Sequence, residues 1–252
     1  MNSSPQGNQG RERSTPDGPE LSRAIESLLV ARNPRRMREA SGELNPGYFL
    51  RAAERLSEGA ARVLIGTGFP VAGTFETDGP PGAMVLYRAL QALGGEPWLA
   101  CGPPLSDVLA DDYRVLPLEA RTPAAAEAEA RRSLRDLNPT ALVAIEQPGM
   151  HEDGRYYNMR GEDISQYSAI FDPYLALAPC PTIAIGDGGN EIGMGNLRDF
   201  VRQLDIRGAA TACDELLVAD VSNWGAYALV ALLGWYRRRD LLADLSLPDI
   251  LH

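Results

Sequence analysis

The chain has 252 residues, a formal net charge of −10 and 24 basic side chains, all of which are arginine because lysine is absent from the sequence. Without lysine, no Schiff base to pyridoxal phosphate or to an aldolase substrate can form, and a Walker A phosphate loop lacks its essential residue. The negative charge repels phosphate backbones, which excludes nucleic acid as a main partner. Neither pyridoxal phosphate, NAD nor ATP is expected as a cofactor.

The first part of the chain predicts a tail and two helices. Residues 1–19 are polar, which predicts a disordered tail in front of a single α/β domain over residues 20–252. Helical spacing of apolar residues over 21–29 predicts the first helix. Asn45 and Pro46 predict the N-cap and the first turn of the second. The inner face of this second helix is expected to be formed by Phe49, Ala52, Ala53 and Leu56.

Apolar runs and helical patterns alternate along the rest of the chain. The runs expected to be strands are 62–65, 97–101, 115–118, 141–145, 182–185 and 215–219. The clearest helices are expected at 81–93, 123–137, 164–176 and 223–237. Such alternation predicts an α/β fold with an open, mostly parallel, Rossmann-like sheet and helices on both faces.

Two features bear on location and assembly. The longest apolar stretch, residues 224–236, is too short to span a bilayer, so no membrane partner is expected. The stretch is either central to the fold or a face for a homodimer.

The three cysteines, Cys101, Cys180 and Cys213, are widely spaced, which argues against a disulfide framework or a structural zinc site. A soluble protein of the reducing cytoplasm is therefore expected.

Three loops are candidates for a functional site. In an open parallel sheet, ligands bind beyond the carboxyl ends of the strands. The segments 66–82, 146–163 and 186–196 follow expected strands and are rich in glycine, acidic and amide residues. Any side chains that recognise a ligand are therefore expected in these loops.

The loop after the first strand predicts an anion site. Glu76, Thr77 and Asp78 stand before the sequence Gly-Pro-Pro-Gly at 79–82, which suits the start of a helix. Free backbone N–H groups and the helix dipole favour an anionic substrate group there. The alternative is that Thr77 or Asp78 only caps the helix.

The loop over 146–163 predicts a carboxylate clamp. Glu146 stands at the end of a strand, and Arg155, Tyr157, Asn158 and Arg160 follow within the loop. Guanidinium groups form planar, bidentate bonds to carboxylates, which amides and hydroxyls can supplement. The alternative is a surface loop held by arginine–acid pairs, which is weighed about evenly for Arg155 and less for Arg160.

The sequence GDGGNEIGMGN at 186–196 predicts close backbone approach to a ligand. Glycines expose N–H groups, and the oxygens of Asp187 and Glu191 can hold a hard divalent cation. Asn190 stands between these two acids. The alternative is a tight turn from a strand into a helix, capped by asparagine.

Together, these loops resemble the C-terminal domain family of D-glutamate cyclase. The matching segments are GTGF and ETDGPPGA at 66–69 and 76–83, DGRYYNMRGEDIS at 153–165 and IGDGGNEIGMGN at 185–196. Their order and approximate spacing also agree. The resemblance implies a carbon–oxygen lyase, a hydro-lyase that converts D-glutamate to 5-oxo-D-proline and water, and hence a small amino acid as the substrate.

Lactam formation requires the substrate to be folded onto itself, so binding must fix both carboxylates. Under the function that the resemblance implies, Arg155 or Arg160 with Asn158 holds the α-carboxylate. Thr77 and the N–H groups at 79–82 hold the side-chain carboxylate.

The acids would then move protons and hold a metal. Asp78 or Glu146 accepts the ammonium proton as a general base. Asp187 and Glu191 hold a divalent cation, Mn²⁺ or Mg²⁺, which polarises the side-chain carboxylate. The other expected substrate contacts are Glu76, Gly79, Tyr157 and Asn190.

Two other functions remain as alternatives. GDGGNE resembles the magnesium-binding GDGxND sequence of haloacid-dehalogenase-like phosphatases, although Glu76 would then replace the aspartate nucleophile. A non-catalytic domain that binds small acids would use the same residue types.

Overall fold

The computed structural model describes residues 17–59 and 61–243. Most of the expected tail, residues 1–16, lies outside the described residues. The described chain forms a six-stranded sheet in which every paired strand is parallel, in the order β5-β4-β1-β6-β7-β8. The strands are β1 (Val63–Thr67), β4 (Trp98–Cys101), β5 (Val115–Pro117), β6 (Ala141–Ile145), β7 (Thr182–Gly186) and β8 (Glu215–Val218). The expected α/β fold with an open parallel sheet is therefore confirmed.

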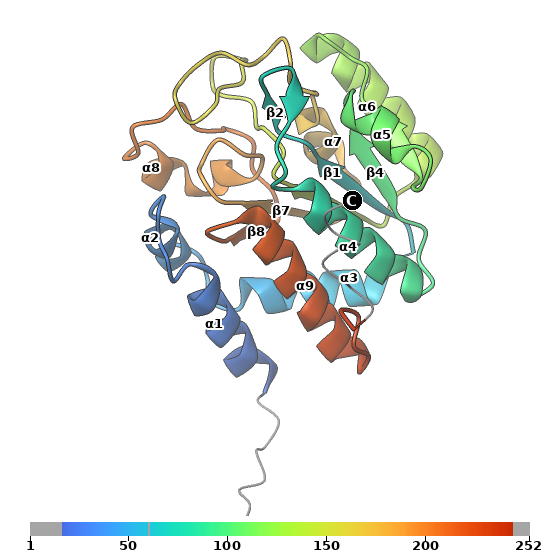
Figure 1. Ribbon diagram of the computed structural model, residues 1–252, viewed down its shortest axis with the longest axis vertical. Coiled ribbons are helices and arrows are strands. Elements are labelled where there is room, and N and C mark those ends of the chain that lie inside the picture. The colour runs from blue at the N-terminus through green and yellow to red at the C-terminus, as the bar shows by residue number, and fades with distance from the viewer. Residues whose placement is uncertain (1–16, 60, 244–252) are drawn as a thin grey trace, which may run out of the picture.

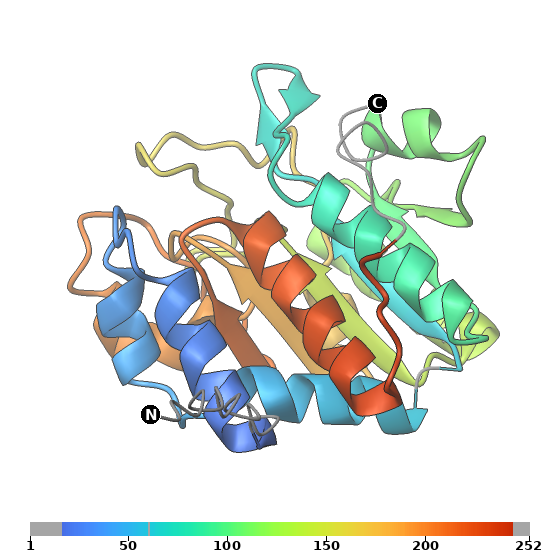
Figure 2. The same cartoon turned by 60° about the horizontal axis from the view of Figure 1, so that its bottom comes forward.

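Helices cover both faces of this sheet (Figures 1 and 2). Side chains of neighbouring residues in a strand point to opposite faces. In β1, Thr67 lies against Gly79 at the start of α4, whereas Gly66 leaves room for the ring of Phe171 next to α7. A Cβ atom at Gly66 would be 2.4 Å from that ring, so glycine permits this packing. Hence α4 and α7 lie on opposite faces.

The helices agree with the expected pattern in part. They are α1 (Gly18–Leu29), α2 (Met37–Gly42), α3 (Tyr48–Gly59), α4 (Pro80–Ala92), α5 (Leu105–Leu109), α6 (Pro123–Leu137), α7 (Asp172–Leu177), α8 (Arg198–Val201) and α9 (Ser222–Arg237), with a 3₁₀ turn at Met194–Leu197. Three helices rather than two precede β1. The second expected helix starts at Tyr48, not at Asn45. Its predicted inner face is fully buried.

The prediction of a helix over 164–176 is wrong. Of this segment, only the part from Asp172 onward is helical. Ile164 and Ile170 instead pack with Phe69 and Tyr156 in a second hydrophobic cluster beside the main core. Pro173, in the first turn of α7, suits the start of a helix rather than its interior.

The sheet order places a topological switch between β1 and β6. From β1, the chain adds β4 and β5 on one side and β6, β7 and β8 on the other. Such a switch opens a crevice beyond the carboxyl ends of the strands. A small antiparallel hairpin, β2 (Pro70–Val71) with β3 (Thr74–Phe75), rises from the loop after β1 over this edge (Figure 2).

The apolar helix α9 is central to the fold. It packs against both α3 and α4, and its inner residues Ala226, Leu229 and Leu233 are fully buried. In the part of the chain that the structure describes, no helix combines the length and hydropathy needed to cross a bilayer.

Candidate functional site

Carboxylates from three loops meet beyond the ends of β1, β6 and β7. Asp78 precedes α4, Glu146 directly follows β6, and Asp187 directly follows β7. One carboxylate oxygen from each lies within 4.8 Å of the others. Glu191, from the loop after β7, is 1% exposed and lines the same cleft. The fold thus brings together the four acids that the sequence nominated for proton transfer and metal binding.

Glu146 has a backbone conformation that few residues with a side chain adopt. Its φ is +46°, in the left-handed region, which costs on the order of 1 kcal/mol or more. Its buried carboxylate accepts a hydrogen bond from the hydroxyl of Ser222, at the start of α9. Gly79 lies directly beside it, because a Cβ atom at Gly79 would be 2.7 Å from that of Glu146. The strain therefore lies at the centre of the acid cluster.

Burial raises the proton affinity of the cluster. Loss of hydration, followed by the negative charges of Asp187 and Glu191, raises the pKa of Glu146 well above its usual value. Loss of hydration and the charge of Glu191 raise the pKa of Asp187 to about 8, although Arg35 opposes this rise. Burial also raises the pKa of Glu191, against the effect of backbone N–H groups, including that of Gly189. Acids of this kind can accept and return protons near neutral pH.

Arg35, which the sequence analysis did not single out, supplies a positive charge. It stands between α1 and α2 and forms an ion pair with Asp187. The segment is tied to the sheet by Asp220, beyond β8, whose carboxylate accepts hydrogen bonds from the backbone N–H groups of Arg32 and Asn33 at 2.7 and 3.0 Å. A turn-forming Asn-Pro pair before Arg35 was the available local signal.

These groups line a cleft of about 490 Å³. Its charged and amide lining consists of Arg35, Glu76, Glu146, Asn158, Arg160, Glu162, Asp163, Asp187, Asn190 and Glu191. Apolar side chains from the β2–β3 hairpin and from residues 159–167, among them Val71, Met159 and Tyr167, form another part of the wall. The cleft therefore joins an acidic floor to an apolar wall, with two arginines.

Five of the predicted site residues do not line this cleft. Thr77 is exposed, and Gly79 is buried beside Glu146. Arg155 forms an exposed ion pair with Asp163 at 3.2 Å, which is the surface role weighed as its alternative. The hydroxyl of Tyr157 donates to Asp153 at 2.6 Å. The fifth is Asp78, whose contacts are given below.

The start of α4 is occupied by a side chain from α9. The backbone N–H groups of Gly79 and Gly82 donate to Oδ1 of Asn223 at 3.0 and 2.8 Å, and the two prolines between these glycines have no N–H. The carboxylate of Asp78 accepts from the N–H groups of Ser222 and Asn223 at 3.0 and 2.7 Å. The prediction of an anion site at the start of α4 is therefore wrong, because Asn223 already occupies its free N–H groups. Asp78 caps α9 rather than α4.

Asn190 presents an unused acceptor in the cleft. Its Nδ2 donates to the backbone oxygen of Tyr157 at 2.9 Å. Its Oδ1 is buried and has no hydrogen-bond partner among the described residues. A buried acceptor without a partner costs about 1–3 kcal/mol, so a ligand that donates a hydrogen bond here is favoured.

The loop over 146–163 is ordered by Asp172, another residue that the sequence analysis missed. The buried carboxylate of Asp172 accepts hydrogen bonds from the backbone N–H of Met150 at 2.8 Å and from the hydroxyls of Tyr156 and Thr211. These bonds tie the loop to the start of α7 and fix the wall of the cleft.

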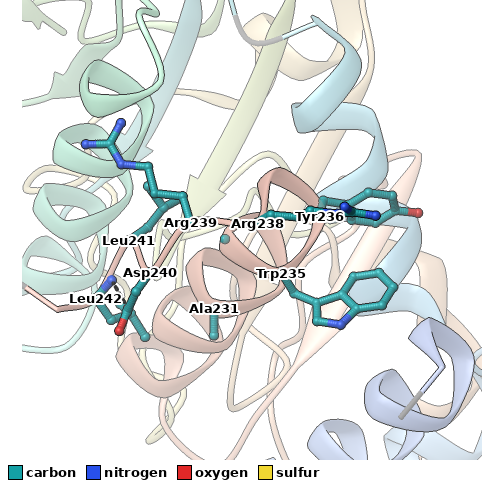
Figure 3. Close-up of a pocket in the computed structure, with 9 residues that line it drawn as sticks. Ala231, Trp235, Tyr236, Arg238, Arg239, Asp240, Leu241 and Leu242 are labelled. Atoms are coloured by element: carbon teal, nitrogen blue, oxygen red, sulfur yellow. Dashed lines mark hydrogen bonds between the residues drawn. The ribbon is translucent and has the colours of Figure 1, made fainter. Parts of the chain in front are cut away.

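A larger pocket, of about 820 Å³, lies at the other end of α9 (Figure 3). It is lined by residues from Ala231 to Leu242, including Trp235, Arg239 and Asp240. Helix α9 begins beside the acid cluster and runs away from it (Figure 2), so this pocket, at the C-terminal end of α9, lies apart from the cluster. None of the buried acids reaches it, so the smaller cleft is the candidate active site.

The chain is similar to proteins of known family. The model of the family described as "D-glutamate cyclase-like, C-terminal" matches residues 25–250. Human mitochondrial D-glutamate cyclase is 37% identical over 211 residues, which cover 73% of this chain and 34% of that protein, so the chain spans about a third of its relative's length.

Two solved structures match the chain at low structural similarity. One, from Streptomyces avermitilis, is assigned to the HAD hydrolase family and has a TM-score of 0.36 and 12% identity over 71% of this chain and 86% of its own. The other, from Listeria monocytogenes, is assigned as a sugar-phosphate isomerase and has a TM-score of 0.37 and 9% identity over 88% of this chain and 90% of its own. At these scores neither structure bears on function. The family match and the human relative together show that the chain belongs to the D-glutamate cyclase-like, C-terminal domain family.

Proposed function

We propose that the chain is a carbon–oxygen lyase that converts D-glutamate to 5-oxo-D-proline and water. The observation that carries this proposal is the placement of buried acids with raised pKa values and two arginines in one cleft. D-glutamate carries one ammonium and two carboxylate groups, which such a cleft can complement. The 37% identity to human D-glutamate cyclase supports the same reaction.

The reaction moves two protons from nitrogen to oxygen. The substrate ammonium carries three hydrogens. The lactam keeps one, and the departing water takes two. The amine attacks the side-chain carboxyl carbon, a C–N bond forms, and a C–O bond breaks. A carboxyl group with a raised pKa can accept a proton from nitrogen and return it to the leaving oxygen.

Glu146 is the better choice for this proton carrier. The oxygens of Asp78 already accept three backbone N–H groups, those of Gly79, Ser222 and Asn223. Glu146, in contrast, lines the cleft and accepts one hydrogen bond from Ser222 among the described residues. Arg160 and Asn158 lie on the same cleft and would hold the α-carboxylate. The amide oxygen of Asn190 would accept a hydrogen bond from the ammonium group.

The acid cluster also fits a divalent cation. Asp78, Glu146 and Asp187 offer oxygen ligands close to one another, and oxygen is the donor that Mg²⁺ and Mn²⁺ prefer. We propose Asp187 and Glu191, which both line the cleft, as the ligands, so that Glu146 stays free to carry protons. A bound cation would polarise the side-chain carboxylate and stabilise negative charge as the C–N bond forms.

The test is to incubate the purified chain with D-glutamate or L-glutamate, with Mn²⁺, Mg²⁺ or EDTA, and to measure oxoproline. Turnover of D-glutamate that falls at least 100-fold in Glu146→Gln, but not in Glu152→Gln, is expected. Glu152 is a matched control because it is an exposed acid, paired with Arg202. Parent turnover in Glu146→Gln contradicts the role of Glu146.

The same measurement separates the alternatives. Absence of oxoproline in every condition, together with hydrolysis of p-nitrophenyl phosphate in Mg²⁺, would favour a phosphatase. Binding of glutamate without turnover would favour a non-catalytic domain.

All three cysteines are unpaired, which supports the proposal that the protein acts in a reducing compartment such as the cytoplasm.

A further inference from the structure

Building on the proposed function, we propose that Arg35 selects substrates with a side-chain carboxylate by leaving Asp187 and binding that carboxylate. The preferred substrate class is then an acidic amino acid rather than its amide. Nothing in the family comparison assigns a role to Arg35.

The guanidinium of Arg35 lies where the reacting groups must meet. It is paired with Asp187, which in turn lies within 4.8 Å of Glu146 through their carboxylate oxygens. If Glu146 carries protons from the amine to the leaving oxygen, the side-chain carboxylate must lie beside it. Arg35 is therefore the arginine that faces the carboxylate undergoing reaction.

The second arginine of the cleft serves the other end of the substrate. Arg160 is exposed, and its own backbone N–H donates to Oδ1 of Asn158 at 3.0 Å. It belongs to the loop that forms the outer wall. The α-carboxylate, which does not react, fits this outer position. Two separate arginines would thus bind the two carboxylates of one substrate.

The pairing of Arg35 with Asp187 allows an exchange of partners. The Arg35 side chain is 43% exposed, whereas that of Asp187 is 5% exposed. A half-exposed arginine can change partners without opening the core. The side-chain carboxylate of the substrate carries the same charge as the carboxylate of Asp187, which Arg35 would leave. Meanwhile the backbone next to Arg35 stays fixed, because Asp220 holds the N–H groups of Arg32 and Asn33.

The experiment compares two ligands of nearly the same shape, D-glutamate and D-glutamine. Their affinities are measured by calorimetry in EDTA for the wild type, Arg35→Gln and Arg35→Lys. The matched control is Arg36→Gln, because Arg36 stacks over Phe200 and faces Glu39 instead of the acid cluster. Melting temperatures confirm that each variant folds.

The wild type is expected to prefer D-glutamate at least tenfold, and Arg35→Gln is expected to bind the two ligands within threefold of each other. Arg35→Lys should retain part of the preference, because it keeps the charge but loses the bidentate geometry. Arg36→Gln should match the wild type. A preference that is unchanged in Arg35→Gln, or equal weakening for both ligands, overturns the inference.

These outcomes separate the inference from the proposed function. A preference that depends on Arg35, found in a protein that forms no oxoproline, contradicts the cyclase proposal alone. Formation of oxoproline with an unchanged preference in Arg35→Gln contradicts the role of Arg35 alone. Absence of D-glutamate binding in the wild type contradicts both.

Discussion

Asp78 and Asn223 cap the starts of two neighbouring helices in a reciprocal manner. Asn223, in the first turn of α9, accepts hydrogen bonds from the backbone of Gly79 and Gly82 at α4, and Asp78, just before α4, accepts from the backbone of Ser222 and Asn223 at α9. The Ser222 hydroxyl then reaches Glu146. The position of the acid cluster therefore depends on the contact between these two helices.

The reciprocal caps predict a loss of stability in Asn223→Ala. The change removes the acceptor for two backbone N–H groups, and the loss of a helix cap costs about 1 kcal/mol, up to about 2. Chemical denaturation should show this decrease in the free energy of unfolding. Asn223→Asp, which keeps an acceptor oxygen at the same place, should lose less. Equal stability of Asn223→Ala and the parent would contradict the capping role.

Gly79→Ala should reduce activity more than stability. Gly79 has φ +98°, and an added Cβ atom would be 2.7 Å from the Cβ of Glu146 and 2.9 Å from Oγ1 of Thr67. The methyl group must displace Glu146 from the cleft floor. We expect oxoproline formation to fall at least tenfold. Gly94→Ala is the control, because Gly94 also has a positive φ but no atom within 4 Å of its added Cβ. It should lose stability through strain and keep its turnover per folded molecule.

Asp187 makes stability depend on pH. In the folded chain its pKa is about 8, whereas in the unfolded chain it is about 4. Between these values the folded state binds the extra proton, so the free energy of unfolding falls as pH rises, by up to about 1.4 kcal/mol per pH unit for one proton. Stability in EDTA should therefore decrease from pH 5 to pH 8.

The variant Asp187→Asn should make this decrease shallower, because asparagine does not titrate. Unfolding curves at several pH values check this prediction. The control is the exposed-acid variant Glu152→Gln, measured in the same way. Parallel profiles for Asp187→Asn and the wild type would show that another group causes the pH dependence.

Asp220→Ala should weaken substrate binding although Asp220 does not line the cleft. Its carboxylate holds the backbone N–H groups of Arg32 and Asn33, and its loss frees the segment that carries Arg35. We expect the KM for D-glutamate to rise several-fold, with a smaller effect on kcat. Asp220→Asn keeps an acceptor oxygen and should restore much of the affinity. An unchanged KM in Asp220→Ala would mean that the segment is held by its other contacts.

The strands were predictable because both faces of the parallel sheet are buried. Each strand therefore appears as a continuous apolar run between polar loops, and the run at 141–145 coincides with β6. The segment 164–176 misled the prediction, since Ile164, Phe171 and Leu175 recur at helical spacing. In the structure, Ile164 and Ile170 instead pack on Phe69 and Tyr156. Periodicity cannot tell these two ways of burial apart.

The candidate site was predictable where it follows strand ends. Glu146 and Asp187 come directly after apolar runs, so the rule for parallel sheets places them at one edge. Ser222 follows β8 and obeys the same rule, whereas Arg35 reaches this edge from the turn between α1 and α2, which follows no strand. The contribution of Arg35 comes from tertiary contacts alone, which a local pattern in one sequence does not encode.

The mutual dependence of α4 and α9 also bears on the order of folding. The bond between Asn223 and Asp78 joins residues 145 positions apart, and that between Arg32 and Asp220 joins residues 188 positions apart. Closing such long loops is slow relative to forming local helices. The cleft is thus assembled only when both ends of the domain have docked, and ligand binding during refolding would report the completion of the whole fold rather than of its central strands.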